Sequence, residues 1–203
     1  MQRLAVATTN RGKLHEIEQL LVGVPFELVT LSHWPDVQAP EETGKTFAEN
    51  ARAKALYYAA RTGELTVAED SGLEIDALDG GPGVESARFG GSESTYPEKF
   101  ALIYNTLHAK GFDGSPARFV CSLALARDGR ILFETRGQVE GGIAPEPKGS
   151  GGFGYDPIFF YPPFGCTLAE AGDRKAAVSH RGEAFRALRT WLNTEGLTRA
   201  NKG

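Results

Sequence analysis

The sequence predicts an α/β fold with a mixed β-sheet flanked by helices. Over residues 4–78, short apolar strands alternate with amphipathic helices, a pattern typical of strands that pair in parallel. A long hairpin follows, because the apolar runs 117–126 and 131–139 flank Asp128-Gly129, a strong signal for a tight turn. Parallel strands followed by a hairpin favour a mixed sheet over a purely doubly wound one.

The N-terminal elements follow from apolar spacing and from helix capping. Leucine and isoleucine side chains recur on one face of a predicted helix at 13–22. Thr46 and Glu49 form a capping box, in which each side chain satisfies a free backbone amide, so a second helix begins there and ends near Arg61. The predicted strands of this part are 4–7, 26–30, 65–68 and 73–78.

The C-terminal elements follow from the same signals. Thr95 and Glu98 form a second capping box, and it opens a helix with an apolar stripe over 100–107. Beyond the hairpin, the sequence predicts a Gly- and Pro-rich loop at 141–157, a strand at 158–160 and a helix at 179–192. Residues 1–193 are therefore expected to form one domain, and the polar segment 194–203 is expected to be frayed.

Charge and cysteine content exclude several classes of protein. The 203 residues carry a formal net charge of −4, whereas nucleic-acid-binding proteins usually have a basic excess. No apolar run approaches the ~20 residues of a membrane span, and the stretch after Met1 is too short for a signal peptide. Cys121 and Cys166 form no CxxC motif, which is typical of reduced thiols. We therefore expect a cytoplasmic protein that binds neither membranes nor, stably, nucleic acid.

Two segments resemble familiar nucleotide-binding motifs but do not meet all their requirements. Glycines within 149–154 match G-x-G-x-x-G, but that motif must open a helix, and here it runs into Pro157. Gly44-Lys45-Thr46 resembles the end of a P-loop, but Ala39 stands where the first glycine of that motif belongs. Neither a Rossmann site nor a P-loop is predicted.

The segment Thr8-Thr9-Asn10-Arg11-Gly12-Lys13 joins a predicted strand to a predicted helix. Small polar residues there expose backbone amides at a helix N-terminus, which attracts anions, and Lys13 adds a positive charge. The same residues also describe an ordinary Asn-capped turn. The spacing leaves both interpretations open.

Two acidic segments are candidate ligands of a divalent cation. Glu69-Asp70-Ser71-Gly72 follows the strand 65–68, and the two acidic side chains would point to opposite faces if that strand continued. Glu41 and Glu42 precede the second helix. Mg²⁺ prefers carboxylates, waters and substrate phosphates, so one or two acids suffice. A solvated acidic turn and a helix-dipole partner are the alternatives.

Two further segments could recognise a nucleotide. In Gly152-Phe153-Gly154-Tyr155-Asp156-Pro157, glycines permit close backbone approach, the aromatic rings could stack on a base, and Asp156 could accept a hydrogen bond. Lys175 and Ser179-His180-Arg181-Gly182 supply donors for phosphate or base oxygens. Core aromatics and a solvated helix start are the alternatives. All the segments together predict a nucleoside-triphosphate hydrolase.

Blocks of residues that run in order over about 4–192 carry a resemblance. They are Ala7-Thr8-Thr9-Asn10-Arg11-Gly12-Lys13, Glu42-Thr43-Gly44, Thr46-Phe47, Glu49-Asn50-Ala51, Glu69-Asp70-Ser71-Gly72-Leu73, Gly81-Pro82-Gly83-Val84, Ser86-Ala87-Arg88-Phe89, residues 152–159 and Ser179-His180-Arg181-Gly182. The chain resembles the RdgB-like non-standard purine nucleoside triphosphate pyrophosphatases, which include inosine triphosphate pyrophosphatases (ITPases).

The resemblance implies an elongated central sheet and two lobes that frame an active-site cleft. It implies a cytosolic homodimer that uses Mg²⁺ and hydrolyses ITP, dITP and XTP to the monophosphate and pyrophosphate. Such an enzyme cleanses the nucleotide pool and prevents incorporation of these nucleotides into DNA and RNA. The alternatives are a Maf-like pyrophosphatase for modified pyrimidine nucleotides and a nucleotide-binding regulator without turnover.

The resemblance also implies a role for each matched residue. Thr8 to Lys13 would hold the phosphates, Asp70 would be the metal-bound general base, and Ser71 would lie next to the substrate. Glu41 or Glu42 would complete the metal site. The residues expected to bind substrate and select the base are Phe153, Gly154, Tyr155, Asp156, Lys175, His180 and Arg181.

Two positions depart from the family pattern, and one residue is expected to select the base. Glu69 stands where bacterial members usually have aspartate, and Thr9 stands where glycine is frequent. Arg181 has only hydrogen-bond donors, so Arg181, or a donor from His180, would favour a 6-oxo purine over the 6-amino group of ATP.

Overall fold

The computed structural model describes residues 1–196. The strands of this part of the chain form one seven-stranded sheet. Its strands are β1 (Arg3–Val6), β2 (Glu27–Thr30), β3 (Leu65–Ile75), β4 (Pro116–Arg127), β5 (Arg130–Ile143), β6 (Phe159–Tyr161) and β7 (Cys166–Thr167). They are hydrogen-bonded in the order β2-β1-β3-β4-β5-β6-β7. β1 pairs in parallel with β2 and β3, whereas β6 pairs antiparallel with β5 and β7. The predicted mixed sheet is confirmed.

Most helices begin within two residues of their predicted start. They are α1 (Arg11–Leu20), α2 (Phe47–Thr62), α3 (Tyr96–Ala109), α4 (Lys175–Val178) and α5 (His180–Trp191). α1 begins two residues before the prediction, because the Asn10 side chain accepts a hydrogen bond from the Lys13 amide and caps it. Thr46 and Glu49 form the predicted capping box of α2.

The chain forms two compact units, and both contain parts of β3, β4 and β5. Unit 1 comprises residues 1–70, 121–137 and the segment from 181 onward, and unit 2 comprises residues 71–120 and 138–180. Of the polar tail predicted at 194–203, residues 197–203 lie outside the described residues. The segment before them, Leu192–Gly196, forms a π-helical turn.

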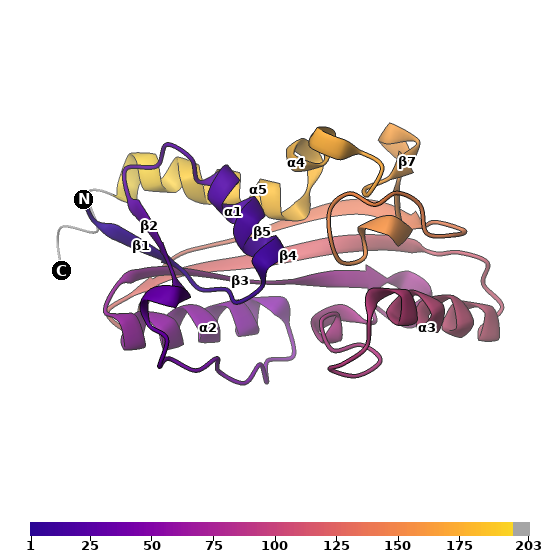
Figure 1. The fold of residues 1–203 in the computed structure, drawn as a ribbon, viewed down its shortest axis with the longest axis horizontal. Coiled ribbons are helices and arrows are strands. Elements are labelled where there is room, and N and C mark those ends of the chain that lie inside the picture. Colours follow the sequence, from indigo (N-terminus) through magenta and orange to yellow (C-terminus); the bar gives the residue numbers. More distant parts are fainter. Residues whose placement is uncertain (197–203) are drawn as a thin grey trace. The chain divides into compact units, whose positions relative to one another are not determined.

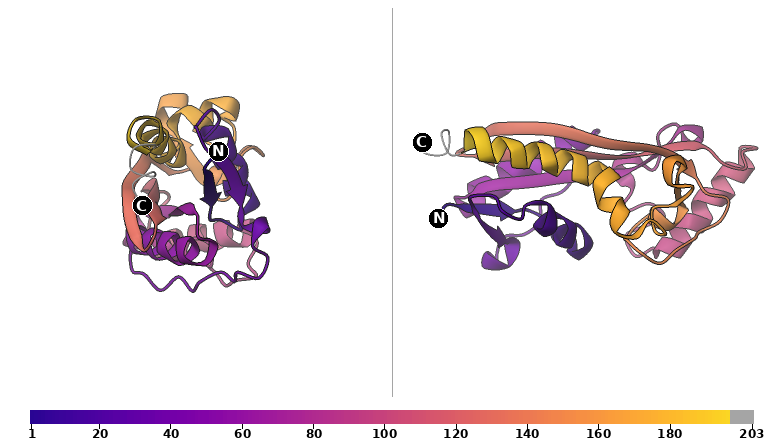
Figure 2. Two further views of the ribbon diagram at one scale, coloured as in Figure 1. Left: turned by 90° about the vertical axis from the view of Figure 1, so that its left-hand side faces the viewer. Right: turned by 90° about the horizontal axis from the view of Figure 1, so that it is seen from above.

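In unit 1, helices cover both faces of the strands. Figure 1 shows α1 and α5 on one side of them and α2 on the other, and the left view of Figure 2 shows the same layers from one end. Alternation along β4 explains the two layers: Leu123 and Leu125 join the core beneath α1 and α5, whereas Ala124 and Ala126 face α2. In the right view of Figure 2, α5 runs along β5, where Trp191 packs on Phe133.

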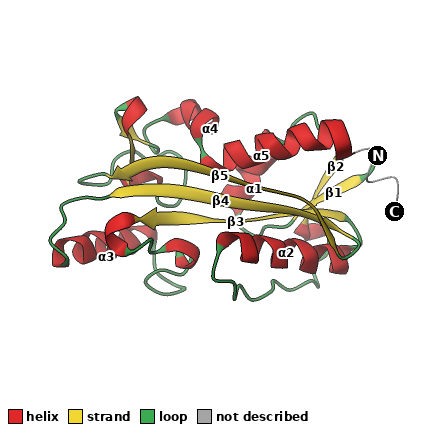
Figure 3. Cartoon of the chain, turned by 180° about the vertical axis from the view of Figure 1, so that it is seen from behind, coloured by secondary structure: helices red, strands yellow, loops and turns green. Residues whose placement is uncertain are grey.

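Unit 2 has its own hydrophobic core. α3 lies beside the C-terminal end of β3 in Figure 3 and buries the predicted apolar stripe, which includes Phe100, Ile103 and Leu107. These side chains pack with Leu73 and Phe159, among others. The core therefore joins α3 to strands that are distant from it in sequence.

The strands differ from the prediction in one place that matters for function. The segments 65–68 and 73–75 belong to one continuous strand, β3, and Asp76–Leu78 form a 3-10 turn instead of its end. Glu69 and Asp70 therefore lie inside a strand and not in a turn after it. The hairpin turn is confirmed, because Asp128 and Gly129 both have positive φ angles of 50° and 72°.

Other elements carried no clear signal. The strand β7 and the one-turn helix α4 are too short to show a periodic pattern, and β5 extends to Ile143, inside the predicted loop. Within the described residues, none of the helices combines the length and the apolar character that crossing a bilayer requires.

Candidate functional site

Glu69 and Asp70 are neighbours in β3, and both residues are buried: Glu69 is 4% exposed and Asp70 is 5% exposed. Consecutive residues of a strand point to opposite faces, so the two carboxylates have different partners. Glu69 contacts α1 and α5, whereas Asp70 contacts α2. All these contacts lie within unit 1.

Glu69 is the centre of a buried ionic network. Its Oε1 atom lies 3.0 Å from Nζ of Lys13 and 3.2 Å from Nη2 of Arg181. The thiol of Cys121 donates a hydrogen bond to its Oε2 atom over 3.0 Å. Arg181 in turn donates from Nη1 to Glu16 over 2.6 Å. One carboxylate therefore joins α1, β4 and α5.

The partners of Glu69 keep it ionised. Burial alone would raise the pKa of its carboxyl group, but the charges of Arg181 and Lys13 outweigh burial, and the pKa lies well below its usual range. Burial and the neighbouring Glu69 charge raise the pKa of the Cys121 thiol well above its usual range. Glu69 is a fixed anion here and a poor proton acceptor.

Asp70 has a different environment. Its Oδ2 atom accepts a hydrogen bond from the Asn50 side-chain amide over 2.9 Å, and its Oδ1 atom lies 3.4 Å from Nζ of Lys54. Nζ of Lys54 also lies 2.7 Å from Oε1 of Glu42. Glu41 is exposed. Of the two predicted glutamates, the structure therefore brings Glu42 to Asp70.

The pKa values of this cluster differ in direction from that of Glu69. Burial raises the pKa of Asp70, and the charge of Lys54 and the hydrogen bond from Asn50 offset this only in part. Burial alone would lower the pKa of Lys54, but the carboxylates of Asp70 and Glu42 raise it above its usual value. A carboxylate with a raised pKa is a better proton acceptor.

Asn50 connects Asp70 to the loop before α2. Its Oδ1 atom accepts a hydrogen bond from the Gly44 amide over 2.8 Å, which leaves its NH₂ group to donate to Asp70. A Cβ atom on Gly44 would lie 2.5 Å from that Oδ1 atom, so the close approach requires glycine. Asn50 is 1% exposed, and it fixes the orientation of the Asp70 carboxylate.

The acidic residues fit a divalent cation that is shared with a substrate. No group of three or more His, Cys, Asp or Glu side chains with metal-binding geometry occurs in the part of the chain that the structure describes. Glu42 and Asp70, however, contact the same ammonium group, so their oxygens already converge on one cation. Two carboxylates completed by phosphates and water are a typical Mg²⁺ environment.

The segment from Thr8 to Lys13 forms the Asn-capped turn that was one of the two interpretations of the sequence. Asn10 caps α1, and its own amide donates to Oγ1 of Thr8 over 3.2 Å. Thr9, Asn10 and Arg11 are exposed, and Gly12 is half-buried at the start of the helix. The loop is an Asn-capped turn, and it also presents the N-terminus of α1 beside Lys13.

In unit 2, Asp156 organises the glycine-rich loop. Its Oδ2 atom accepts hydrogen bonds from the Phe153 amide over 2.8 Å and from Nζ of Lys175 over 2.7 Å. A Cβ atom on Gly152, which has a φ of +68°, would lie 2.2 Å from the same oxygen. Nζ of Lys175 lies 5.0 Å from the centre of the Phe153 ring. Gly154 also has a positive φ, of 71°.

Three other residues were expected to contact the substrate, namely Tyr155, His180 and Ser71. Tyr155 is 4% exposed, and its hydroxyl donates to the backbone oxygen of Ser86, so it is a core residue and not an open stacking surface. His180 is buried and stacks on Phe119, with the ring centres 4.9 Å apart. Ser71 is half-buried in β3.

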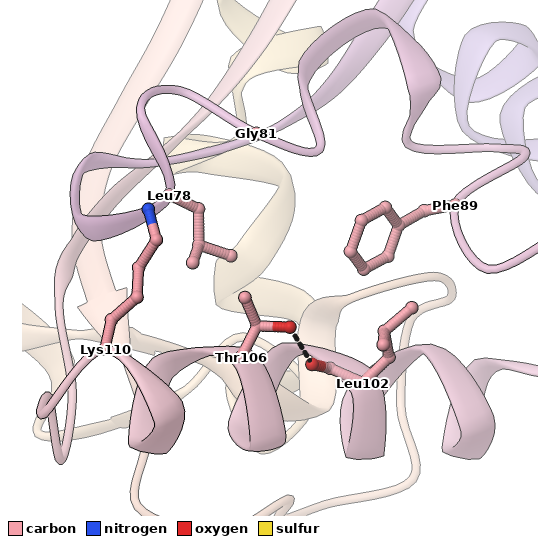
Figure 4. A pocket seen from close by; sticks show the side chains of 6 residues that line it. All are labelled: Leu78, Gly81, Phe89, Leu102, Thr106 and Lys110. Carbon is pink, nitrogen blue, oxygen red and sulfur yellow. Dashed lines mark hydrogen bonds between the residues drawn. The ribbon is translucent and has the colours of Figure 1, made fainter.

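A cavity of about 310 Å³ also lies in unit 2, and none of the predicted site residues lines it. Its lining residues are Leu78, Gly81, Phe89, Leu102, Thr106 and Lys110. In Figure 4 the side chains of Leu78 and Phe89 point into it. Nζ of Lys110 donates hydrogen bonds to the backbone oxygen of Ala77 and to Oδ2 of Asp79. Most of its lining is apolar, and the ammonium group of Lys110 is already paired with Asp79.

The sequence analysis did not identify four residues of the site: Glu16, Asn50 as a partner of Asp70, Lys54 and Cys121. One signal was available for two of them. Asn50 and Lys54 are four residues apart on a helix rich in alanine, so they form a polar pair on one face. Glu16 and Cys121 gave no signal, because their partners are distant in sequence.

Known proteins resemble this chain over nearly its whole length. A model of the Ham1 family matches residues 4–191. A Geobacter sulfurreducens protein named dITP/XTP pyrophosphatase is 44% identical over 198 residues, which are 97% of this chain and 100% of that protein. A protein of the same name from Gloeobacter violaceus is 48% identical, with 93% of each chain covered.

A solved structure described as a HAM1 protein from Coxiella burnetii superimposes with a TM-score of 0.88. It is 39% identical, and the match covers 95% of this chain and 98% of that one. A dITP/XTP pyrophosphatase structure from Mycobacterium abscessus gives a TM-score of 0.74 at 39% identity, with 92% and 98% covered. The sequence resemblance is confirmed, and the chain belongs to the Ham1 family.

Proposed function

We propose that this protein hydrolyses non-standard purine nucleoside triphosphates, namely ITP, dITP and XTP, to the monophosphate and pyrophosphate. Relatives named dITP/XTP pyrophosphatase support the reaction class over nearly the whole chain. The structural observation that carries the proposal is the environment of Asp70. Its carboxylate is buried, has a raised pKa and accepts a hydrogen bond from Asn50. The ammonium group of Lys54 contacts both this carboxylate and that of Glu42. The enzyme removes these nucleotides before they are incorporated into DNA or RNA.

Asp70 acts as the general base. It takes a proton from a water molecule, whose oxygen forms a bond to the α-phosphorus while the bond to the bridging oxygen of the β-phosphate breaks. That oxygen leaves with pyrophosphate. Asn50 holds the carboxylate in orientation through its side-chain amide.

Glu42 and Asp70 would hold Mg²⁺, with Glu41 exposed to solvent. When bound, Mg²⁺ supplies charge neutralisation for the triphosphate. The loop from Thr8 to Lys13, which leads into the N-terminus of α1, binds phosphate oxygens through backbone amides and the Lys13 charge. Glu69 keeps that lysine in place.

Phe153, Gly154, Asp156, Lys175 and His180 recognise the base in this proposal. Asp156 and Lys175 fix the loop that carries Phe153, whose half-buried ring offers a stacking surface. Arg181 has a different task, because its guanidinium bonds to Glu16 and Glu69. We therefore assign Arg181 to the buried ionic network that contains Glu69 and Lys13, and not to recognition of the 6-oxo group of the purine base. Homodimer formation and a cytoplasmic location belong to the proposal on the family resemblance alone.

The experiment is product analysis with ITP and a parallel incubation with a pyrimidine triphosphate. Chromatography and ³¹P NMR should show IMP and pyrophosphate in equal amounts, with activity lost in EDTA and restored by Mg²⁺. IDP and orthophosphate as direct products would contradict the proposal. Faster hydrolysis of the pyrimidine nucleotide would favour a Maf-like specificity instead.

A further inference from the structure

Lys54 occupies a particular position among the acidic residues. Its Nζ atom contacts both carboxylates that we assign to the metal, at 2.7 Å from Glu42 and 3.4 Å from Asp70. The side chain is 12% exposed, so the contact is largely shielded from water. Lys54 lies within α2, whose N-terminus is fixed by a capping box, so its backbone is held rigidly.

An ammonium group and a divalent cation cannot use the same carboxylate oxygens without strong repulsion. Two positive charges within a few ångströms repel each other most where little water screens them. A metal ion that binds Glu42 and Asp70 must therefore displace the Lys54 ammonium. The displaced charge then needs another anion, since a partly buried ammonium without a counterion is unfavourable.

We propose that Lys54 acts as a competitor of the metal: it neutralises Glu42 and Asp70 in the absence of nucleotide, so that metal and triphosphate bind as a coupled pair. This inference rests on the proposed function for its assignment of the metal site. The triphosphate supplies the new counterion for Lys54, and the coupling is reciprocal, because each ligand raises the affinity of the other by the same factor.

The second lysine of the site does not compete in this way. Nζ of Lys13 contacts Glu69, which lies on the opposite face of β3 from Asp70. Lys13 therefore stays with its own carboxylate when a metal binds on the other face. The competition is specific to Lys54, and a variant of that residue isolates it.

The test measures Mn²⁺ binding to the full-length protein by electron paramagnetic resonance, without nucleotide. Lys54→Met should raise the Mn²⁺ affinity by at least about tenfold, because removal of the ammonium leaves both carboxylates without their competitor. Lys45→Met is the matched control, since it removes a charge from an exposed position just before α2 and should change the affinity less than about twofold. Equal or weaker Mn²⁺ binding by Lys54→Met would overturn the inference.

A second measurement needs no variant, and it tests the coupling even if Lys54→Met does not fold. Thermal unfolding of the wild-type protein is followed over a series of Mn²⁺ concentrations, with and without an ITP analogue whose α–β bridge is a methylene group. Mn²⁺ alone should stabilise the protein little, and Mn²⁺ with the analogue should stabilise it strongly. Equal stabilisation by Mn²⁺ in both series would contradict the coupling.

The proposed function can fail separately from this inference. ITP hydrolysis is measured on the same wild-type preparation. The wild-type protein could release pyrophosphate from ITP while the Lys54→Met variant gains no Mn²⁺ affinity. That result would contradict only the competition between Lys54 and the metal. Coupled binding of Mn²⁺ and the analogue without pyrophosphate release contradicts only the reaction.

Discussion

Glu69 and Asp70 are adjacent in β3, and their carboxylates lie on opposite faces of that strand within unit 1. Glu69 is held at 3.0 Å from Lys13 and 3.2 Å from Arg181, whereas Asp70 accepts a hydrogen bond from Asn50 on α2. Their pKa values move in opposite directions for this reason: two cations lower that of Glu69, and burial raises that of Asp70. Two acids that look equivalent in the sequence therefore have different chemical tasks.

Exchange of each acid for its amide should separate these tasks. Asp70→Asn should lower kcat for ITP by about 10²–10⁴, the range expected for loss of a general base, while circular dichroism shows an intact fold. Glu69→Gln keeps the base but weakens the hold on Lys13, so it should act mainly through KM. Steady-state kinetics distinguish the two. Near-normal kcat in Asp70→Asn together with an inactive Glu69→Gln would show that the assignment is reversed.

Arg181→Ala should lower the stability of the fold, and it should lower the activity on ITP and on ATP to a similar extent. Removal of the guanidinium leaves buried Glu69 with one cation fewer, and breaking a buried ion pair costs about 3–5 kcal/mol of unfolding free energy. Because the guanidinium supports the Lys13 network, kcat/KM should fall by similar factors for ITP and ATP.

Urea denaturation measures the first effect of Arg181→Ala, and competition kinetics with ITP and ATP measure the second. His180→Ala is the comparison variant, since its imidazole belongs to unit 2 and stacks on Phe119. A preference for ITP that narrows sharply in Arg181→Ala alone would instead assign Arg181 to the 6-oxo group.

Gly152→Ala tests whether binding of ITP requires the backbone at residue 152 to lie close to the Asp156 carboxylate. Its Cβ would lie 2.2 Å from Oδ2 of Asp156 and 3.2 Å from Nζ of Lys175, so the loop that carries Phe153 has to move. The variant should raise KM for ITP several-fold more than it changes kcat.

Gly165→Ala is the matched control for Gly152→Ala. Gly165 has a similar φ of +63°, but no atom lies within 4 Å of the added Cβ, so the control shows only the backbone cost of about 1–2 kcal/mol. Equal KM values for the two variants would contradict the positioning of the loop by Asp156.

The two cysteines should differ in thiol reactivity. Cys121 is fully buried, and burial together with the Glu69 charge raises its thiol pKa, so little thiolate forms at pH 8. Cys166 is partly exposed. Ellman's reagent should therefore modify one thiol quickly in the native protein and two in guanidinium chloride. Cys166→Ser should abolish the fast phase, and a fast phase that persists would show that Cys121 is accessible.

The sequence determined the local features of this protein. Capping at Asn10 and at Thr46–Glu49, apolar periodicity and the Asp128-Gly129 turn act over a few residues, so they predicted most helices and strands and the mixed sheet. The family motifs also predicted the types of chemical group at the candidate site. Alternation along a strand even predicted that Glu69 and Asp70 would diverge if that strand continued.

Only the tertiary structure decided which groups meet. Glu69 and Arg181 are separated by 112 positions, and Cys121 lies 52 positions from Glu69, so no local pattern reports their contacts. The fold also brought Glu42, and not Glu41, to Lys54, and it placed Tyr155 in the core. Ionic partners and burial depend on how distant elements pack, because packing sets the distance between charges and the water that screens them.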